Sequence, residues 1–209
     1  MSDDRLALAR RWVREYTPNP HPDLGRDGVV CPYMVRALRR NYVRMESFDA
    51  ARDDEELVAL ARRLLDDSLR RAKTMGPDRT YLVSLIVPHG KPEDELKALV
   101  GRAHAVLKPD FVQSGYMAGD FWPDHETVGL HSDTFRPFTS PVPILGMRPI
   151  VPADLLFFVK HEPTPQDRLR YLRYFQTLFS GRLNEYWQAE LDRELDRAER
   201  DAQATRSTR

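Results

Sequence analysis

The order of predicted elements along the 209-residue chain indicates an α+β fold. Helices alternate with the first strands, and a later segment rich in apolar residues indicates adjoining strands. A long, charged helix follows them. We therefore expect a mixed or mainly antiparallel sheet of about five strands, with helices packed chiefly on one face. Because the composition changes nowhere sharply, we expect one domain over residues 1–204 and a frayed tail over residues 205–209.

The first half of the chain contains the clearest helical patterns. Apolar residues at helical spacing follow the acidic run "SDD", and the prolines of "TPNPHP" end this first helix. Pro32 suits the first turn of a short helix over residues 33–40. Residues 53–73 carry a leucine stripe behind the acidic run "DDEE", and residues 91–108 form a second acid-capped helix. The strands expected between these helices are "NYVRMESF" and "TYLVSLIVP".

The second half is predicted as strands followed by two helices. Densely spaced Gly and Pro separate the apolar runs "SGYMAGDFW", "PILGMRPI" and "DLLFFVK", which we expect to be strands. Residues 165–181 return to a helical pattern. From Leu183 onward, acids and bases recur three or four residues apart, as in Glu190 and Arg193, which is typical of a solvent-exposed helix. This long C-terminal helix would suit the contact of a homodimer.

Charge and cysteine content narrow the classes of partner. Lys+Arg and Asp+Glu both number 32, so the net charge is zero and neither nucleic acid nor an anionic membrane is expected as a partner. No run approaches about 18 uninterrupted apolar residues, so no membrane span is expected. The single cysteine, Cys31, excludes an internal disulfide and predicts a cytoplasmic protein. A small-molecule substrate is the partner that we expect.

Two long proline-rich loops are the candidates for a functional site. The sequence has no glycine-rich phosphate loop, no C-x-x-C and no G-x-S-x-G motif. The first loop, residues 19–34, reads "NPHPDLGRDGVVCPYM", and the second loop, residues 120–143, reads "DFWPDHETVGLHSDTFRPFTSPVP". Long loops that a rigid scaffold supports often carry binding and catalytic residues.

The first loop contains a candidate thiolate ligand. Cys31 precedes Pro32 at the expected start of a helix, where the helix dipole favours the thiolate over the thiol. Thiolate is one of the standard axial ligands of haem iron. The alternative is that Cys31 is a small buried hydrophobic residue. We expect His21, which lies between prolines, to have a structural role.

The second loop contains candidate ligands for iron and for an anion. His125 and His131, together with Asp120, could form the two-histidine, one-carboxylate triad of a non-haem iron site. Their spacing of six residues fits neither a helix face nor alternate strand positions, so a solvated polar loop is the alternative. Arg136 could pair with a nearby acid, or its planar guanidinium could bind the carboxylate of a ligand.

Both loops carry a resemblance to known families. "HPDLGRDGVVCPYMVRAL" and "GLHSDTFRPFTSPVPILGMRPIVPADLLFF" are similar to an uncharacterised domain family of actinobacteria and some other microbes, with HPxLGRxGxVCP and GLHxxxFRPxxSPVP motifs. More distantly, the chain resembles the YqcI/YcgG family, which includes haem-dependent enzymes that N-hydroxylate arginine and related amino acids. That family has an early Cys-Pro-Phe/Tyr loop and a Val-Gly-Leu-His-Pro segment. The chain departs from it at Ser132, which replaces the proline, and at Arg148, which lies nearest to the position of its second histidine.

The distant resemblance implies a haem-binding oxidoreductase. On this reading haem b is bound by His131 as the axial ligand, Arg136 or Arg148 pairs with a propionate, and Cys31 is a competing ligand or a pocket residue. The activity implied is N-oxygenation of an amino-acid-like small molecule in natural-product biosynthesis. Two alternatives stay open. One is a metal-free binding or accessory domain, and the other is a non-haem iron oxygenase that uses Asp120, His125 and His131.

Overall fold

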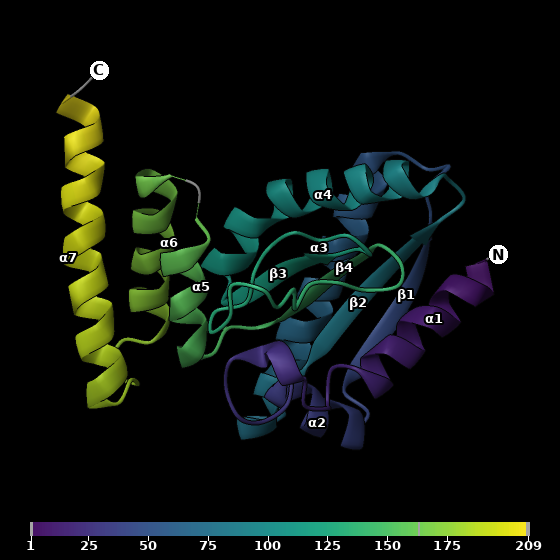
Figure 1. The fold of residues 1–209 in the computed structure, drawn as a ribbon, viewed down its shortest axis with the longest axis horizontal. Coiled ribbons are helices and arrows are strands. Elements are labelled where there is room, and N and C mark those ends of the chain that lie inside the picture. The colour runs from purple at the N-terminus through teal and green to yellow at the C-terminus, as the bar shows by residue number, and fades with distance from the viewer. Residues whose placement is uncertain (1, 163, 208–209) are drawn as a thin grey trace. The chain divides into compact units, whose positions relative to one another are not determined.

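The computed structural model describes residues 2–162 and 164–207 and confirms the α+β class (Figure 1). The chain divides into two compact units: residues 1–108 with 116–149, and residues 109–115 with 150–209. The single domain over residues 1–204 stays a prediction. The first unit contains the sheet and both proline-rich loops, so it contains the candidate site.

The first unit is built on a mixed sheet with the strand order β1-β2-β4-β3. β1 and β2 are parallel, with Val43 opposite Val83, and β4 runs antiparallel to both β2 and β3. Within the described residues the sheet has four strands, where the sequence predicts about five. The strands are β1 (Val43–Asp49), β2 (Val83–His89), β3 (Tyr116–Phe121) and β4 (Ile144–Pro149).

The helices of the first unit begin close to where the sequence predicts them. Asp53 caps the third helix by accepting a hydrogen bond from the Glu56 amide at 2.8 Å. Asp54, Glu55 and Glu56 follow in its first turn, where the helix dipole favours acids. The helices are α1 (Ser2–Glu15), η1 (Pro22–Leu24), α2 (Pro32–Arg39), α3 (Asp54–Ala72), η2 (Gly76–Tyr81) and α4 (Glu93–Gln113). The last five residues of α4, 109–113, belong to the second unit.

Helices cover both faces of the sheet, which corrects the prediction that they lie chiefly on one. Val83, Leu85 and Val87 of β2 pack with α1 and α2 in one hydrophobic cluster. On the other face, Arg44 of β1 forms an ion pair with Asp67 of α3 at 2.8 Å. The reason is visible in β2, where residues 83–88 are all buried, because an apolar strand without alternation needs cover on both sides.

One segment that the sequence predicts as a strand is a helix, and it belongs to the second unit. "DLLFFVK" is predicted as a strand, but residues 155–160 form a helix in which Leu155 and Phe158, three residues apart, are fully buried. A short apolar run fits a buried helix and a buried strand equally well by its pattern alone. Here Pro152 and the Asp154 carboxylate, which accepts the Val151 amide at 2.9 Å, start a helical turn.

Helices make up the second unit. Thr164 caps the middle helix by accepting the Asp167 amide at 3.0 Å, and Tyr171 and Phe175 form its buried side. The C-terminal helix runs to Ser207, so residues 205–207 are helical where the sequence predicts fraying, and residues 208–209 lie outside the described residues. The elements are η3 (Pro152–Asp154), α5 (Leu155–Lys160), α6 (Pro165–Leu178) and α7 (Glu185–Ser207).

Candidate functional site

The two proline-rich loops pack against each other in the first unit. Gly25 has φ +73°, and a Cβ placed there would lie 1.9 Å from the carbonyl oxygen of His131. Glycine is therefore required at this position both by the backbone conformation and by the close approach of the second loop. The rings of His21 and Phe135 also meet across the two loops, with centroids 4.7 Å apart. The loops that the sequence singles out separately thus form one site.

Backbone hydrogen bonds hold the first loop against the end of α1. The Val30 amide donates to the Asn19 carbonyl at 2.9 Å, and the Cys31 amide donates to the Thr17 carbonyl at 2.8 Å. The Arg26 guanidinium crosses the loop and donates to the Val29 carbonyl at 3.0 Å. The loop is therefore an ordered structure that can position side chains, because its backbone groups are paired within it.

The second loop is closed by its own hydroxyl groups. The Ser132 hydroxyl accepts the Phe135 amide at 3.1 Å, and the Gly129 amide donates to the Phe135 carbonyl at 2.9 Å. Further on, the buried Ser140 hydroxyl donates to the Val142 carbonyl at 2.6 Å. These bonds fix the side-chain direction of the residues between them, including Arg136.

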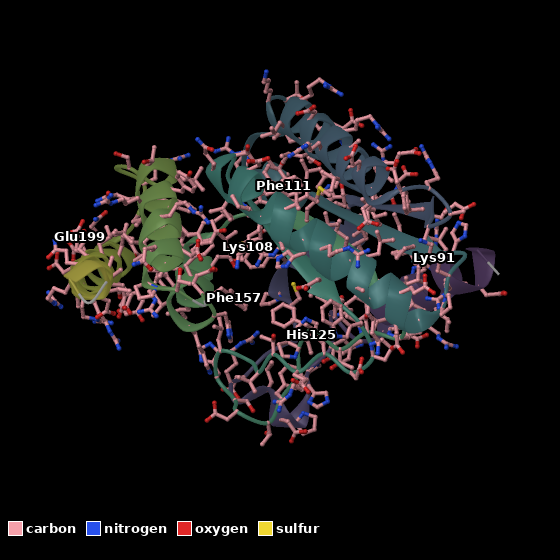
Figure 2. All side chains as sticks on the ribbon, turned by 90° about the horizontal axis from the view of Figure 1, so that it is seen from above. Lys91, Lys108, Phe111, His125, Phe157 and Glu199 are labelled. Atoms are coloured by element: carbon pink, nitrogen blue, oxygen red, sulfur yellow. The ribbon has the colours of Figure 1, made fainter. Side chains whose placement is uncertain are left out.

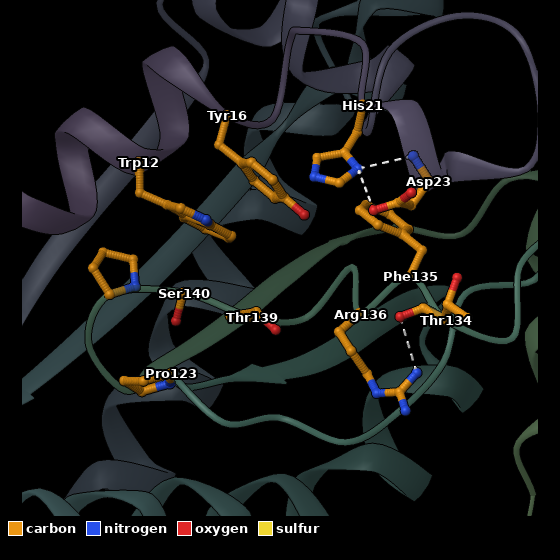
Figure 3. Close-up of a pocket in the computed structure, with 11 residues that line it drawn as sticks. Trp12, Tyr16, His21, Asp23, Pro123, Thr134, Phe135, Arg136, Thr139 and Ser140 are labelled. Carbon is orange, nitrogen blue, oxygen red and sulfur yellow. Dashed lines mark hydrogen bonds and ion pairs between the residues drawn. The ribbon is translucent and has the colours of Figure 1, made fainter.

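The α1 helix and the two loops line a pocket of about 530 Å³ that is open to solvent, which we call the Trp12 pocket. Figure 3 shows side chains of α1 on one side of the pocket and side chains of the second loop on the other. A volume of this size lies within the range of about 300–1,000 Å³ that small-molecule sites occupy. Its lining residues are Trp12, Tyr16, His21, Asp23, Pro123, Thr134, Phe135, Arg136, Thr139, Ser140 and Pro141.

Aromatic rings form the α1 wall of the Trp12 pocket. The rings of Trp12 and Tyr16 stack with centroids 5.8 Å apart and an interplanar angle of 21°. Trp12 also meets Phe121 of β3 edge-on at 5.5 Å, which fixes the wall on the sheet. The Tyr16 hydroxyl is protonated at neutral pH and can donate a hydrogen bond, and burial raises its pKa further above neutrality. The wall therefore presents planar apolar surface with a neutral polar end.

His21 presents one ring nitrogen to its own loop and leaves the other available. Its Nδ1 accepts the Asp23 amide at 3.2 Å, and the Asp23 carboxylate lies 3.9 Å from the same atom. A neutral ring that accepts at Nδ1 carries its proton on Nε2. In Figure 3 the second nitrogen of His21 lies on the side of the ring that faces Tyr16. His21 therefore adds a hydrogen-bond donor to the pocket wall.

Arg136 is the cationic group of the Trp12 pocket. Its Nη1 donates to the carbonyls of Asp133 and Thr134 at 3.1 and 3.3 Å, which hold the guanidinium in place. Within the described part of the chain, no carboxylate forms an ion pair with it. Its Nε and Nη2 atoms are thus left to donate to a ligand, and the acidic side chain that lines the same pocket, Asp23, belongs to the first loop and forms no ion pair with it.

The structure does not gather the four residues that the haem hypothesis assigns. Arg136 lines the Trp12 pocket, whereas His131 is exposed and contributes its backbone to the contact with Gly25. Cys31 is half-buried and packs against the hydrophobic cluster of α1, α2 and β2. Arg148 on β4 donates to the Pro149 carbonyl at 3.0 Å. Among these four residues, therefore, only Arg136 belongs to the pocket.

Asp120 and His125 lie together, but their third neighbour is His104 of α4. The Asp120 carboxylate is 3.4 Å from His104 Nδ1 and 3.7 Å from Nε2 of His125, which is labelled in Figure 2. Burial by itself raises the pKa of Asp120, but the two imidazoles outweigh burial and hold that pKa well below its usual range. In residues 2–162 and 164–207, no three His, Cys, Asp or Glu side chains are arranged to hold a metal ion.

Three residues of the Trp12 pocket are not identified by sequence patterns. Trp12 lies on α1 and Tyr16 directly follows its last residue, a spacing of four that the sequence predicts for the apolar face of a helix. The sequence predicts a structural role for His21. One signal was available in the sequence: two large aromatic residues directly precede a His-Pro loop. A short helix cannot bury both rings fully, and both are half-exposed in the structure. Their convergence with Arg136 depends on long-range packing, which a pattern in one segment does not contain.

The fold defines an α+β protein with helices on both faces of a mixed sheet. Residues 6–186 match the family model described as a domain of unknown function, DUF6875, and the chain belongs to that family. Neither the curated proteins nor the solved structures contain a match to the chain. The more distant resemblance to the YqcI/YcgG family stays a prediction. None of the helices in the described residues is long and apolar enough to cross a bilayer.

Proposed function

We propose that the protein binds a small organic anion with a planar, apolar body in the Trp12 pocket. Arg136 carries the proposal, because an ordered guanidinium without an acidic partner in the described residues faces a pocket with aromatic walls. A planar guanidinium matches the two oxygens of a carboxylate. The apolar part of the ligand would lie against Trp12 and Phe135.

The other polar groups of the pocket predict a second polar group on the ligand, a hydrogen-bond acceptor. His21 Nε2 and the Tyr16 hydroxyl are hydrogen-bond donors on the α1 side of the pocket, opposite the loop that carries Arg136. A ligand with its carboxylate on Arg136 would therefore place an acceptor, such as a carbonyl or hydroxyl oxygen, toward His21. This proposal corresponds to the metal-free binding domain that the sequence left open.

A pair of matched probes tests the charge requirement. We expect 2-naphthoate to bind the wild-type protein more tightly than 2-naphthalenemethanol, which has the same ring system without the charge, in isothermal titration calorimetry. Arg136→Gln should remove that difference, a loss of about tenfold or more in affinity for naphthoate. The control is Arg10→Gln, because Arg10 is exposed on α1 and does not line the pocket. Equal affinities of the wild type for the two probes would refute the proposal.

Haem-dependent N-oxygenation of an amino-acid-like substrate is the second candidate function. The observation that favours it is that the Trp12 pocket contains an imidazole, His21, together with an arginine that could face a propionate. Haem would supply oxygen activation, and the residues of the chain would supply the axial ligand and the pocket. The resemblance implies His131 as the axial ligand, with Cys31 as its competitor. The pocket and the resemblance therefore assign the axial ligand to different residues.

Absorption spectra with added hemin separate these assignments. If haem binds in the Trp12 pocket, His21→Ala abolishes or shifts the Soret band and His131→Ala leaves it unchanged. The resemblance predicts the opposite pattern, and a thiolate ligand predicts that Cys31→Ala alone shifts the band. A protein whose spectrum is unaffected by hemin would remove haem from the proposal. Iron by elemental analysis without porphyrin absorption would support the non-haem alternative through Asp120, His125 and His131.

A further inference from the structure

A second pocket lies on α2, and it shares no lining residue with the Trp12 pocket. Its volume is about 370 Å³, and its lining combines three arginines with one tyrosine and a small apolar surface. We call it the Arg39 pocket. Its lining residues are Pro32, Val35, Arg36, Arg39, Arg40 and Tyr81.

The end of α2 explains how the arginines are positioned. Asn41 follows the helix with φ +55°, its amide donates to the Leu38 carbonyl at 3.2 Å, and the Tyr42 amide donates to the Ala37 carbonyl at 2.8 Å. These are the two hydrogen bonds of a Schellman motif, with asparagine in the left-handed position. The last helical carbonyls are thus satisfied by backbone amides, so the arginine side chains are not needed to cap the helix.

Arg36 is the anchored member of the three arginines. It forms an ion pair with Asp78, and its guanidinium carbon lies 4.9 Å from the centre of the Tyr81 ring. Asp78 also accepts a hydrogen bond from the Tyr42 hydroxyl at 3.2 Å. These contacts hold one guanidinium and one aromatic ring at fixed places in the lining of the pocket.

Arg39 and Arg40 supply charge that nothing in the described residues neutralises. Both are exposed, and neither guanidinium has a hydrogen-bond or ion-pair partner in residues 2–162 and 164–207. With Asp78 offsetting Arg36, the pocket keeps an excess of two positive charges from the remaining arginines. Arg39 and Arg40 line one concave site together with Arg36, which sets them apart from arginines dispersed over the surface.

We propose that the Arg39 pocket binds the phosphoryl group of a small molecule. A phosphoryl group carries up to two negative charges and offers three oxygens, which matches an excess of two positive charges and several guanidinium forks. Pro32 and Val35 add a small apolar surface beside the anion. The Trp12 pocket differs, since its lining has a single arginine and suits a singly charged group. The proposal does not depend on what binds in the Trp12 pocket.

Calorimetric titration of the full chain with inorganic pyrophosphate, at constant ionic strength, tests this proposal. We expect saturable binding by the wild type and a loss of about tenfold or more in affinity for Arg39→Gln/Arg40→Gln. The matched control is Arg10→Gln/Arg11→Gln, which removes two consecutive exposed arginines from α1 that line neither pocket. Its affinity should equal that of the wild type.

Three results would overturn the proposal. They are an absence of saturable binding by the wild type, an unchanged affinity in the Arg39→Gln/Arg40→Gln variant, and an equal loss in the α1 control, which would indicate non-specific attraction. Circular dichroism of each variant verifies that it is folded. A parallel titration with ADP identifies the source of the phosphoryl group: tighter binding than pyrophosphate supports a nucleotide, and equal binding supports the free anion.

Discussion

Replacing Gly25 by alanine tests whether the two proline-rich loops form one site. The new Cβ would lie 1.9 Å from the His131 carbonyl oxygen, so the loops must separate by about 1.5 Å before ordinary contact is restored. Holding alanine at φ +73° costs about 1–2 kcal/mol, and overpacking typically costs about 1–3 kcal/mol more. We therefore expect Gly25→Ala to lower the free energy of unfolding by about 2–5 kcal/mol.

Two other glycines provide controls that separate backbone strain from the clash. A Cβ at Gly76, which has φ +55°, would have no atom within 4 Å, and a Cβ at Gly28, in the first loop with φ +97°, would have only the Arg26 guanidinium nearby at 3.5 Å. The alanine variants of Gly76 and Gly28 therefore have the strain of a positive φ without a clash between the new Cβ and a backbone atom. We expect each to cost less than Gly25→Ala in urea unfolding, and only Gly25→Ala to weaken naphthoate binding in the Trp12 pocket.

Amide hydrogen exchange localises the effect. The amides of Leu24, Val30 and Cys31 are bonded within the first loop or to the end of α1, so their protection reports on the order of this loop. Gly25→Ala should reduce their protection more than it reduces that of amides in β2. If Gly25→Ala costs no more than Gly76→Ala and leaves these amides protected, the packing of the two loops described above is wrong.

Three further predictions concern groups outside the pockets. Asp120→Asn should destabilise the protein by about 1–3 kcal/mol at pH 7. In urea unfolding, the difference in stability between the variant and the wild type should be smaller at pH 3 than at pH 7, because a carboxyl whose native pKa lies below its unfolded value of about 3.9 stabilises fully above that value and loses this contribution as the pH falls toward the native pKa; a constant difference would contradict this. Burial raises the pKa of Tyr116 to about 12, so one tyrosine should ionise last in an ultraviolet pH titration. Stability should fall between pH 10 and 12, where only the unfolded Tyr116 ionises, and Tyr116→Phe should remove that part of the fall. Thr164→Ala should cost about 1 kcal/mol by removing the cap of α6, and no change in thermal midpoint would argue against the cap.

Local patterns predict most of the secondary structure. The acidic caps and leucine stripe of α3, the alternation in β1 and the apolar run of β2 each depend on residues close together in the chain. The same patterns fail at α5, because Leu155 to Lys160 can be buried as a helix or as a strand. They also do not indicate that the sheet is covered by α1 and α2 on one face and by α3 on the other, as the apolar residues on both faces of β2 require.

The candidate site is predictable in part. The proline-rich composition marks both loops as functional candidates, and the planar guanidinium of Arg136 indicates a binding group for a carboxylate. The Trp12 pocket, however, joins residues 12–23 to residues 123–141. Likewise, Asp120 lies beside His125 of its own loop, while its other neighbour, His104, comes from the middle of α4.

The α+β class, nearly every helix and strand, and the two proline-rich loops follow from the sequence alone, because they depend on the spacing of apolar, acidic, glycine and proline residues over a few turns. Which side chains share a pocket depends instead on tertiary packing. Gly25 lets the first loop reach the His131 carbonyl, and the same contact leaves the His131 imidazole exposed while His21 meets Phe135. That arrangement is set by close packing between distant segments, which no local pattern specifies.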